Sequence, residues 1–291
     1  KPNVALSFLS YTNIIAVLAQ KFSHAKLRLL LSEHSLPSIS SSSAKRLLSL
    51  LFDKWMSRWL YPHADKVICV SQGVADSVRT QYRMPPEKLK VIYNPVDIKR
   101  ISTLAQENVA HPWFSEKETP IIISVGRLNV QKGYPYLLRA FAQVSTKFPS
   151  HLVILGQGEE EQALKALTKE LGIEDKVAFL GFQKNPFKYV ARSDLFVLAS
   201  LRESFGMVIT ETMNCGTPVL STNCPTGPGE IITNGVNGLL VPPADEIALT
   251  EAMLRLLNDK ELAARLARAG RKRAKDFAVE KIVKQYEELF E

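Results

Sequence analysis

The sequence lacks several features that would define a class of protein at once. Its three cysteines, Cys69, Cys215 and Cys224, form no Cys-x-x-Cys pair and are odd in number, so they indicate neither a disulfide framework nor a zinc site. No run of about 18 apolar residues is present to span a bilayer, and no cleavable secretion signal is recognisable. We therefore expect a cytoplasmic protein, with peripheral attachment to the inner face of the cytoplasmic membrane left open.

Acidic residues are fewer than basic ones. The 29 Asp and Glu against 37 Lys and Arg give a formal charge of +8, which suits an anionic partner such as a nucleotide, a phospholipid surface or a nucleic acid. The cations are spread through predicted helices, and no basic motif with interleaved aromatic residues is present. We therefore expect no nucleic-acid partner.

Short apolar runs alternate with helical patterns along the whole chain. This alternation is typical of a doubly wound α/β sheet, and the number of runs predicts two such sheets. The runs are VALSFL (4–9), LRLLLSE (27–33), KVICVS (66–71), LKVIYNPVD (89–97), IIISVG (121–126), HLVILG (151–156), KVAFLG (176–181), DLFVLAS (194–200), TPVLST (217–222) and GLLVP (238–242).

A polar segment near residues 98–118, without strand character, separates the two sets of runs and is expected to be a linker. We expect a first Rossmann-like domain over 1–105, a second over 106–275 and a C-terminal helix over 276–291 that packs back toward the first domain. The first set has only four runs, whereas such folds usually have about five or six strands. We infer that two βα units are absent at the N-terminus.

Two glutamates after a predicted strand give the strongest signal. In ESFGMVITE (203–211), Glu203 directly follows the run DLFVLAS and Glu211 comes eight positions later. Ligands of a parallel sheet bind beyond the carboxyl ends of its strands. If a helix begins near Gly206, its free amides and both carboxylates face one crevice, where they can bind a polyhydroxyl ligand. The simpler alternative is a solvated acidic loop followed by an acid near a helix N-terminus.

Two cations follow another predicted strand. In SVGRLNVQKG (124–133), Gly126 and Arg127 directly follow the strand and Lys132 comes five positions after Arg127. An arginine fork and a mobile lysine on one short loop can neutralise a diphosphate without a metal ion. Either cation alone would be read as an ordinary charge in solvent. Their shared position with the glutamates at strand ends favours an anion-binding clamp.

The patterns GR-x4-K and E-S-F-G-x4-E together resemble the retaining glycosyltransferases of family four, which have the GT-B fold. The resemblance implies an α/β protein with two Rossmann-like doubly wound domains facing across a cleft, the N-terminal, acceptor-side domain being incomplete and the C-terminal domain binding the nucleotide sugar. It extends over essentially the whole chain through KVICVSQGVAD (66–76), VIYNPVD (91–97), STNCPTGPGE (221–230) and NGVNGLLVPPAD (234–245).

The family's site residues are carried over onto the matching positions. The resemblance implies that Arg127 and Lys132 hold the donor diphosphate, Glu203 the donor-sugar hydroxyls and Glu211 the ribose hydroxyls. GQGEE (156–160) is expected to give structural support. Backbone groups that complete the donor site are expected at Gly126, Phe182, Gln183, Phe205, Gly206 and Met207.

One candidate lies in the first domain. His34, in LLLSEHSLP, falls where the family often places a histidine close to the donor sugar, and the adjacent Glu33 is a candidate second polar contact. A capping or loop histidine is the alternative reading.

Cofactors and partners follow from these motifs. No Asp-x-Asp is present, so we expect no metal requirement and no other cofactor. The expected partners are a nucleotide-diphosphate sugar, with a UDP-sugar inferred from the CPTGP segment, and a glycan or lipid-linked acceptor. The family implies transfer with retention, in which the leaving phosphate helps to deprotonate the acceptor hydroxyl.

Several alternatives remain open at this point. The same fold also serves nucleotide-sugar epimerases and phosphorylases, and a nucleotide-sugar-binding fragment without catalysis is a further reading. An apolar, basic helix predicted over 47–61 and the basic run RKRAKD (271–276) are candidates for contact with an anionic membrane surface. An ordinary packed helix and a solvated face fit them equally well.

Overall fold

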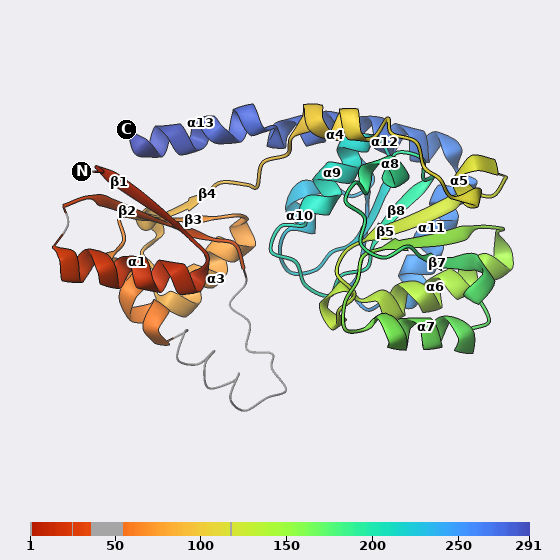
Figure 1. The fold of residues 1–291 in the computed structure, drawn as a ribbon, viewed down its shortest axis with the longest axis horizontal. Helices are drawn as coiled ribbons and strands as arrows, with labels where there is room; N and C mark the ends of the chain where they lie inside the picture. The colour runs from red at the N-terminus through yellow and green to blue at the C-terminus, as the bar shows by residue number, and fades with distance from the viewer. Residues whose placement is uncertain (1, 25, 36–54, 117) are drawn as a thin grey trace. The chain divides into compact units, whose positions relative to one another are not determined.

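The computed structural model describes residues 2–24, 26–35, 55–116 and 118–291. The chain forms two compact units, one of residues 1–94 and 282–291 and the other of residues 95–281 (Figure 1). Most of the serine-rich loop at 35–45, and the predicted helix at 47–61 up to residue 54, lie outside the described residues. Residues 55–60 are helical, as predicted.

The N-terminal unit is built on a parallel sheet of order β1-β2-β3-β4. Its central runs of Leu, Val and Ile are buried because helices cover parallel strands on both faces. The strands are β1 (Val4–Phe8), β2 (Arg28–Glu33), β3 (Lys66–Cys69) and β4 (Leu89–Val91), and the helical elements include α1 (Ser10–Ser23), η1 (Tyr61–His63), α3 (Gln72–Tyr82) and η2 (Pro86–Lys88).

The C-terminal unit contains a six-stranded parallel sheet of order β10-β9-β8-β5-β6-β7. The chain runs outward from β5 through β6 to β7, and then returns to place β8 on the other side of β5. The strands are β5 (Ile121–Val125), β6 (His151–Leu155), β7 (Val177–Phe179), β8 (Leu195–Leu198), β9 (Val219–Thr222) and β10 (Leu239–Val241). Each of the ten predicted runs therefore contains a strand, and the doubly wound α/β prediction is confirmed.

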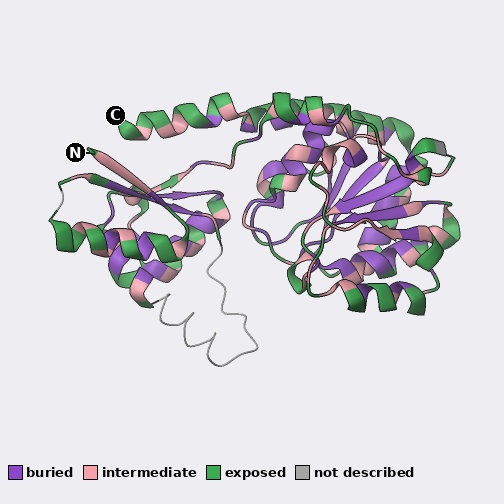
Figure 2. Cartoon of the chain, viewed as in Figure 1, coloured by how far each residue is buried: buried purple, intermediate pink, exposed green. Residues whose placement is uncertain are grey.

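Helices cover the second sheet on both sides, and the strands form the buried centre of the unit (Figures 1 and 2). The helices form two groups: in the first, two helices both contact α6, and in the second, two helices both contact α9. The first comprises α6 (Tyr134–Lys147), α7 (Glu161–Glu170) and α11 (Glu246–Asn258); the second comprises α8 (Phe187–Val190), α9 (Met207–Cys215) and α12 (Lys260–Ala274). The remaining elements are η3 (Val130–Lys132), η4 (Glu174–Lys176), α10 (Pro228–Ile231) and η5 (Lys275–Phe277).

The segment expected to be a linker contains two short helices, α4 (Ile98–Leu104) and α5 (Pro112–Glu116), and belongs to the C-terminal unit. Side chains from that unit hold its backbone: Asn214 Nδ2 donates to Ile98 O at 3.0 Å and Arg192 Nη1 to Ala105 O at 3.0 Å. Sequence pattern missed these helices because they are short and are held by long-range contacts.

The last helix, α13 (Val279–Phe290), contributes residues 282–291 to the N-terminal unit. Ile282 is fully buried in a cluster with Leu30, Ile68 and Ile92, so α13 supplies part of the core of the first sheet. Within the described residues, no helix has both the length and the apolar character needed to cross a membrane.

Candidate functional site

The order in which the chain adds strands to the second sheet reverses between β5 and β8. These two parallel strands lie side by side, with Ile122 paired to Leu195 (Figure 1). Open α/β sheets bind ligands in the crevice beyond the carboxyl ends of the strands at such a switch point. The loop after β5 carries Arg127 and Lys132, and the loop after β8 carries Glu203. The two strongest sequence motifs therefore flank the position at which the topology itself predicts a ligand.

Lys132 and Glu203 meet directly at this switch point. Lys132 Nζ lies 2.5 Å from Glu203 Oε1, and the two side chains are only 20% and 10% exposed. The two loops are also joined through their backbones, because Leu201 N donates to Gln131 O at 2.8 Å. The ion pair is therefore shielded from solvent, and the attraction between its charges is stronger than in an exposed pair.

Gly133 makes this close approach of the two loops possible. Its φ is +64°, and a Cβ at this position would lie 2.1 Å from Ala199 O. Glycine adopts the left-handed conformation without strain, and its lack of a Cβ leaves room for the neighbouring backbone. Lys132 is thereby held against the carboxyl end of β8.

Two hydroxyl groups that the sequence analysis missed also hold Glu203. Ser200 Oγ, fully buried, donates to Glu203 Oε1 at 2.7 Å, and Thr226 Oγ1 donates to Glu203 O. Thr226 comes from the CPTGP segment, which therefore braces the glutamate loop. A single Ser or Thr belongs to no sequence motif that would identify it as functional. The position of Ser200, just beyond the strand and three residues before Glu203, was nevertheless an available signal.

Arg127 lines a pocket of about 380 Å³ beyond the ends of β5, β6 and β7. Its guanidinium has no ion-pair partner among the residues that the structure describes, and the residue is exposed. The pocket therefore offers a cation to a ligand. It is lined by Val125, Gly126, Arg127, Leu155, Gly156, Gln157, Phe182, Gln183 and Pro186, which brings the predicted residues Gly126, Arg127, Phe182 and Gln183 together.

The loop that carries Gln183, at the rim of this pocket, is held by hydrogen bonds within the protein. Gln183 Nε2 donates to Leu180 O at 2.7 Å, and Tyr189 Oη donates to Gln183 Oε1 at 3.3 Å, so the amide side chain is used within its own loop. Phe182 is 70% exposed. The loop therefore offers mainly backbone groups and an aromatic face to a ligand.

The GQGEE segment packs against the loop after β5. A Cβ on Gly156 would lie 1.9 Å from Gly126 O, and one on Gly158 would lie 2.2 Å from Leu128 O, so these glycines let the two loops touch. The segment therefore supports the loop after β5 and also contributes Gln157 to the pocket lining.

The start of α9 completes this end of the sheet. Gly206 precedes the helix at φ +92°, and the first amides of α9 have no partners within the helix. Phe205 is buried with its ring 5.5 Å from that of Phe277, whereas Met207 is 41% exposed. Of the three predicted residues, Phe205 is anchored in the core, Gly206 forms the turn and Met207 is exposed. They lie at a helix N-terminus, which is suited to bind an anion.

Glu211 lies in α9, partly buried. Burial raises the pKa of its carboxyl group above the ordinary value. Among the described residues it has no hydrogen-bonding or ion-pair partner. A carboxylate in this state is suited to accept hydrogen bonds from ligand hydroxyls.

His34 belongs to the N-terminal unit, at the carboxyl end of β2. Its Nε2 lies 3.0 Å from Ser32 Oγ, and its ring centroid is 5.6 Å from that of Phe8. Burial lowers the pKa of His34, against the opposing effect of the Glu33 carboxylate. Burial therefore favours the neutral form of the imidazole.

The neighbouring Glu33 is not available to a ligand. It is fully buried and accepts hydrogen bonds from Tyr61 Oη at 2.7 Å, from Ser10 Oγ at 2.9 Å and from the backbone and side chain of Ser35 at 3.2 and 3.0 Å. This burial and these internal hydrogen bonds argue against the interpretation of Glu33 as a second polar contact.

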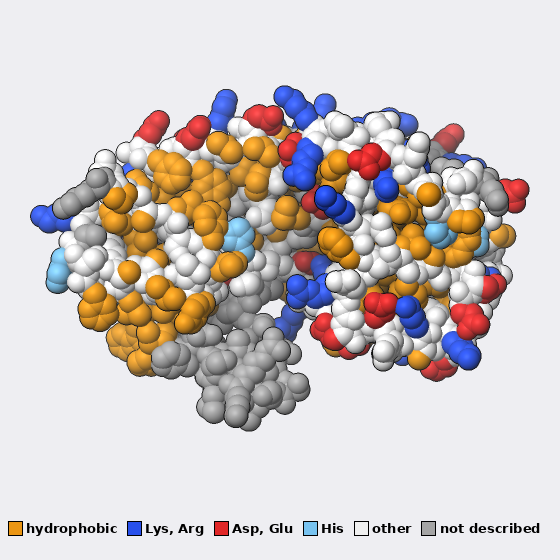
Figure 3. All heavy atoms as spheres, in the orientation of Figure 1, with side chains coloured by type: hydrophobic (Ala, Val, Ile, Leu, Met, Phe, Trp, Pro, Cys, Tyr) orange, Lys and Arg blue, Asp and Glu red, His pale blue; other side chains and the backbone are white. Residues whose placement is uncertain are grey.

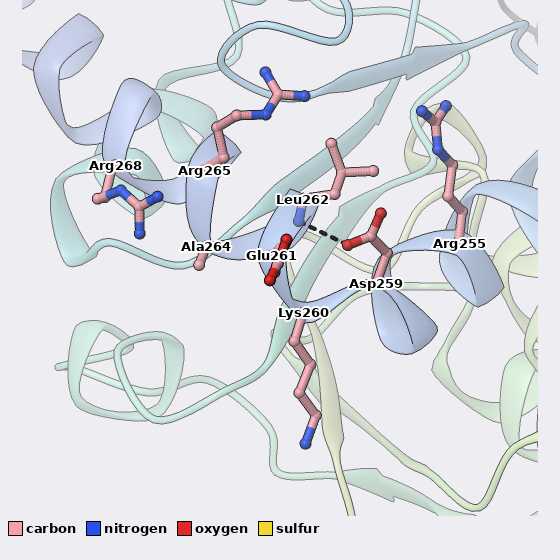
Figure 4. A pocket seen from close by; sticks show the side chains of 8 residues that line it. All are labelled: Arg255, Asp259, Lys260, Glu261, Leu262, Ala264, Arg265 and Arg268. Carbon is pink, nitrogen blue, oxygen red and sulfur yellow. Dashed lines mark hydrogen bonds between the residues drawn. The ribbon is translucent and has the colours of Figure 1, made fainter.

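A larger hollow of about 730 Å³ lies at the turn between α11 and α12, away from the strand-end loops (Figure 4). Asp259 there caps α12 by accepting from Leu262 N at 2.9 Å, and Arg265 donates to Gly235 O at 3.2 Å. Figure 4 shows Lys260 pointing away from Arg255 and Arg265, so the cations do not converge on one point. This hollow is not a second candidate for the site.

Together, the fold and the site define a class: an α/β protein whose doubly wound sheet carries cations, carboxylates and a helix N-terminus at its switch point, an arrangement suited to an anionic, hydroxyl-bearing ligand. Residues 106–273 match the family described as glycosyl transferases group 1, and residues 1–100 match glycosyltransferase family 4. The chain therefore belongs to the family 4 glycosyltransferases, and its two units are the Rossmann-like domains of the GT-B fold.

Relatives of known sequence agree with this assignment. The N-acetylgalactosamine-N,N'-diacetylbacillosaminyl-diphospho-undecaprenol 4-alpha-N-acetylgalactosaminyltransferase of Campylobacter jejuni is 34% identical over 95% of this chain and 73% of its own length. The N-acetyl-alpha-D-glucosaminyl L-malate synthase of Bacillus anthracis is 32% identical over 78% of this chain and 59% of its own length. The chain thus spans about three fifths to three quarters of these relatives.

Solved structures agree as well. Anabaena HepE in complex with UDP and glucose is 25% identical, has a TM-score of 0.83 and matches 99% of this chain and 77% of its own. Sucrose-phosphate synthase of Thermosynechococcus elongatus, 24% identical with a TM-score of 0.82, matches 99% of this chain and 73% of its own and shows the same fold.

Proposed function

We propose that this chain carries the donor site of a retaining, metal-independent glycosyltransferase that moves a sugar from a UDP-sugar to a glycan or lipid-linked acceptor. Two observations carry the proposal: Lys132 and Glu203 meet at the β5/β8 switch point, and Arg127, on the same loop as Lys132, lines a pocket beyond the end of β5. Support for the donor and acceptor classes comes from the UDP and glucose of the Anabaena structure and from the diphospho-undecaprenol acceptor named for the Campylobacter relative.

Each residue has a distinct role in the proposed reaction. Arg127 and Lys132 stabilise the negative charge that grows on the β-phosphate as the sugar C1–O bond breaks. Preorganised donors of this kind contribute about 3 kcal/mol each. Glu203 holds hydroxyls of the donor sugar, Glu211 holds those of the ribose, and the amides at the start of α9 face the phosphate or the sugar.

The proposed transfer occurs on one face of the sugar. The acceptor oxygen forms its bond to C1 on the side from which the diphosphate departs, and the hydroxyl proton passes to the leaving phosphate oxygen. UDP and a glycoside of unchanged anomeric configuration are the products. His34, at the carboxyl end of β2, is proposed to contact the donor sugar.

Donor identity is tested first by thermal shift with UDP-Glc, UDP-Gal, UDP-GlcNAc, UDP-GalNAc and GDP-Man, for which we expect a UDP-sugar to stabilise the chain most. Transfer is then followed with that donor, and NMR coupling constants of the product report its anomeric configuration. A product of inverted configuration contradicts the retaining mechanism, and loss of rate in EDTA contradicts metal independence. Donor binding without transfer would favour a binding role instead.

A further inference from the structure

Tyr134 is the first residue of α6 and follows the loop of residues 126–132, which carries Arg127 and Lys132. It is only 2% exposed, and its ring belongs to the hydrophobic core of the C-terminal unit. A phenylalanine ring would fill this position without burying a polar group, whereas a buried hydroxyl costs free energy unless it is hydrogen-bonded. The partners of the Tyr134 hydroxyl therefore indicate its role.

The hydroxyl holds the backbone of this loop. Tyr134 Oη donates to Gly126 O at 3.2 Å, and Ser124 of β5 is hydrogen-bonded to the same hydroxyl. Burial raises the pKa of Tyr134, so the hydroxyl keeps its proton and remains a donor. Within the described part of the chain, Gly126 O accepts no other hydrogen bond. Tyr134 is therefore the group that fixes this carbonyl.

Fixing the carbonyl of Gly126 also fixes the start of Arg127. A trans peptide unit is planar, so the direction of Gly126 O sets the direction of Arg127 N and Cα. On its other side Gly126 is held by β6, because Gly126 N donates to Leu155 O at 2.9 Å. The backbone that leads into Arg127 is thus held at both ends of residue 126.

The same hydroxyl lies beside the stem of Lys132. A Cβ on Gly126 would lie 3.2 Å from Tyr134 Oη, and 3.4 and 3.5 Å from Lys132 Cε and Cδ. The hydroxyl and the lysine stem therefore converge on one point of the backbone. From there Lys132 Nζ extends to Glu203 Oε1 at 2.5 Å. Both ends of the loop meet at Gly126, against Tyr134.

The surface charge of this unit makes the fixed geometry of the loop important. Figure 3 shows Lys and Arg side chains interspersed with Asp and Glu over the visible face of the C-terminal unit. Mixed charge of this kind does not concentrate an anion at one place. Cations that are already held in position lose less conformational freedom when a ligand binds, so they bind it more tightly.

We propose that Tyr134 is a positioning residue of the donor site: its hydroxyl fixes the Gly126–Arg127 peptide and so sets the direction in which Arg127 leaves the loop. The inference rests on the proposed function, because the ligand of Arg127 is taken to be the diphosphate of a nucleoside diphosphate. Tyr134 is buried, and it acts through Arg127 rather than on the ligand.

The first measurement needs no ligand. In Tyr134→Phe, which keeps the ring, amide hydrogen exchange in residues 126–132 should be about tenfold faster than in the wild type, because the loop opens more easily. The matched control is Tyr136→Phe on the same helix. Tyr136 packs against the core, and its hydroxyl has no hydrogen-bond partner among the described residues. This control should exchange as the wild type does, and melting curves show whether each variant is folded.

The second measurement is calorimetric titration of UDP. Tyr134→Phe should bind UDP about fivefold more weakly than the wild type, and Tyr136→Phe should bind it equally well. In the Arg127→Ala background, adding Tyr134→Phe should change the affinity less than twofold, because the side chain that the hydroxyl positions is gone. A general loosening of the fold would cost the same in both backgrounds.

The proposal is overturned if Tyr134→Phe exchanges or binds UDP as the wild type does, or if its loss of affinity is equally large without Arg127. Failure of the proposed function gives a different result. Arg127→Ala alone would then bind UDP as tightly as the wild type, and the inference would fall together with the donor site.

Discussion

Lys132 Nζ and Glu203 Oε1 lie 2.5 Å apart, although the two residues are separated by 71 positions in the sequence. In the proposed reaction the lysine serves the diphosphate and the glutamate serves the sugar. Without a donor, the two side chains form an ion pair with each other. A bound diphosphate must therefore compete with the Glu203 carboxylate for Lys132, and this competition has consequences that can be measured.

Glu203→Gln should bind UDP more tightly than the wild type does, by about tenfold, while transfer from a UDP-sugar falls by orders of magnitude. The change removes the competing carboxylate and a negative charge beside the diphosphate, and it also removes the sugar's charged hydrogen-bond acceptor. Calorimetry with UDP and steady-state kinetics separate the two effects. Weaker UDP binding by this variant would show that the carboxylate assists the diphosphate.

Ser200→Ala should lower kcat/KM for transfer by about tenfold and leave the affinity for UDP unchanged. Ser200 Oγ touches Glu203 and so acts by fixing the orientation of that carboxylate. The control is Ser193→Ala, another buried serine, whose Oγ donates to Tyr189 O at 2.9 Å. If kcat/KM fell equally in the two variants, Ser200 would contribute only to the stability of the fold and not to the orientation of Glu203.

Gly133→Ala should lower the free energy of unfolding by about 3 kcal/mol, because the new Cβ would collide with Ala199 O in a strained backbone conformation. Gly172→Ala is a closely matched control. Gly172 has the same φ of +64° with nothing within 4 Å of its Cβ position, so only the conformational cost of about 1 kcal/mol remains. Urea unfolding measures both; equal losses would show that the loops separate without cost.

The pH dependence of stability should change at Glu211. Burial raises the pKa of this carboxyl group above its ordinary value of 4.5. Its contribution to stability is therefore present below the ordinary value and is lost as the pH rises through the raised pKa. Glu211→Gln should gain stability relative to the wild type as the pH rises above 4.5. Urea titrations across this range test it, with exposed Glu170→Gln as the control; a difference independent of pH would be the contrary result.

Much of the fold could be predicted from the sequence, because runs such as IIISVG and DLFVLAS are apolar throughout and bounded by polar or small residues. The position of Glu203 and Lys132 at strand ends followed from the same pattern. Their direct contact did not, since it depends on β8 returning beside β5. Ser200 and Thr226 were missed because an isolated hydroxyl has no pattern, and α4 and α5 because their stability comes from packing.

The placement of the donor diphosphate at the Gly126–Lys132 loop is tested most directly by calorimetric titration of UDP into Arg127→Ala. Arg127 is exposed and lines the pocket, so its removal should leave the fold unchanged. We predict an affinity about thirtyfold weaker than that of the wild type. Arg139→Ala, which removes an exposed arginine paired with Glu246, should bind normally. Equal UDP affinity of Arg127→Ala and the wild type would contradict the proposed donor site.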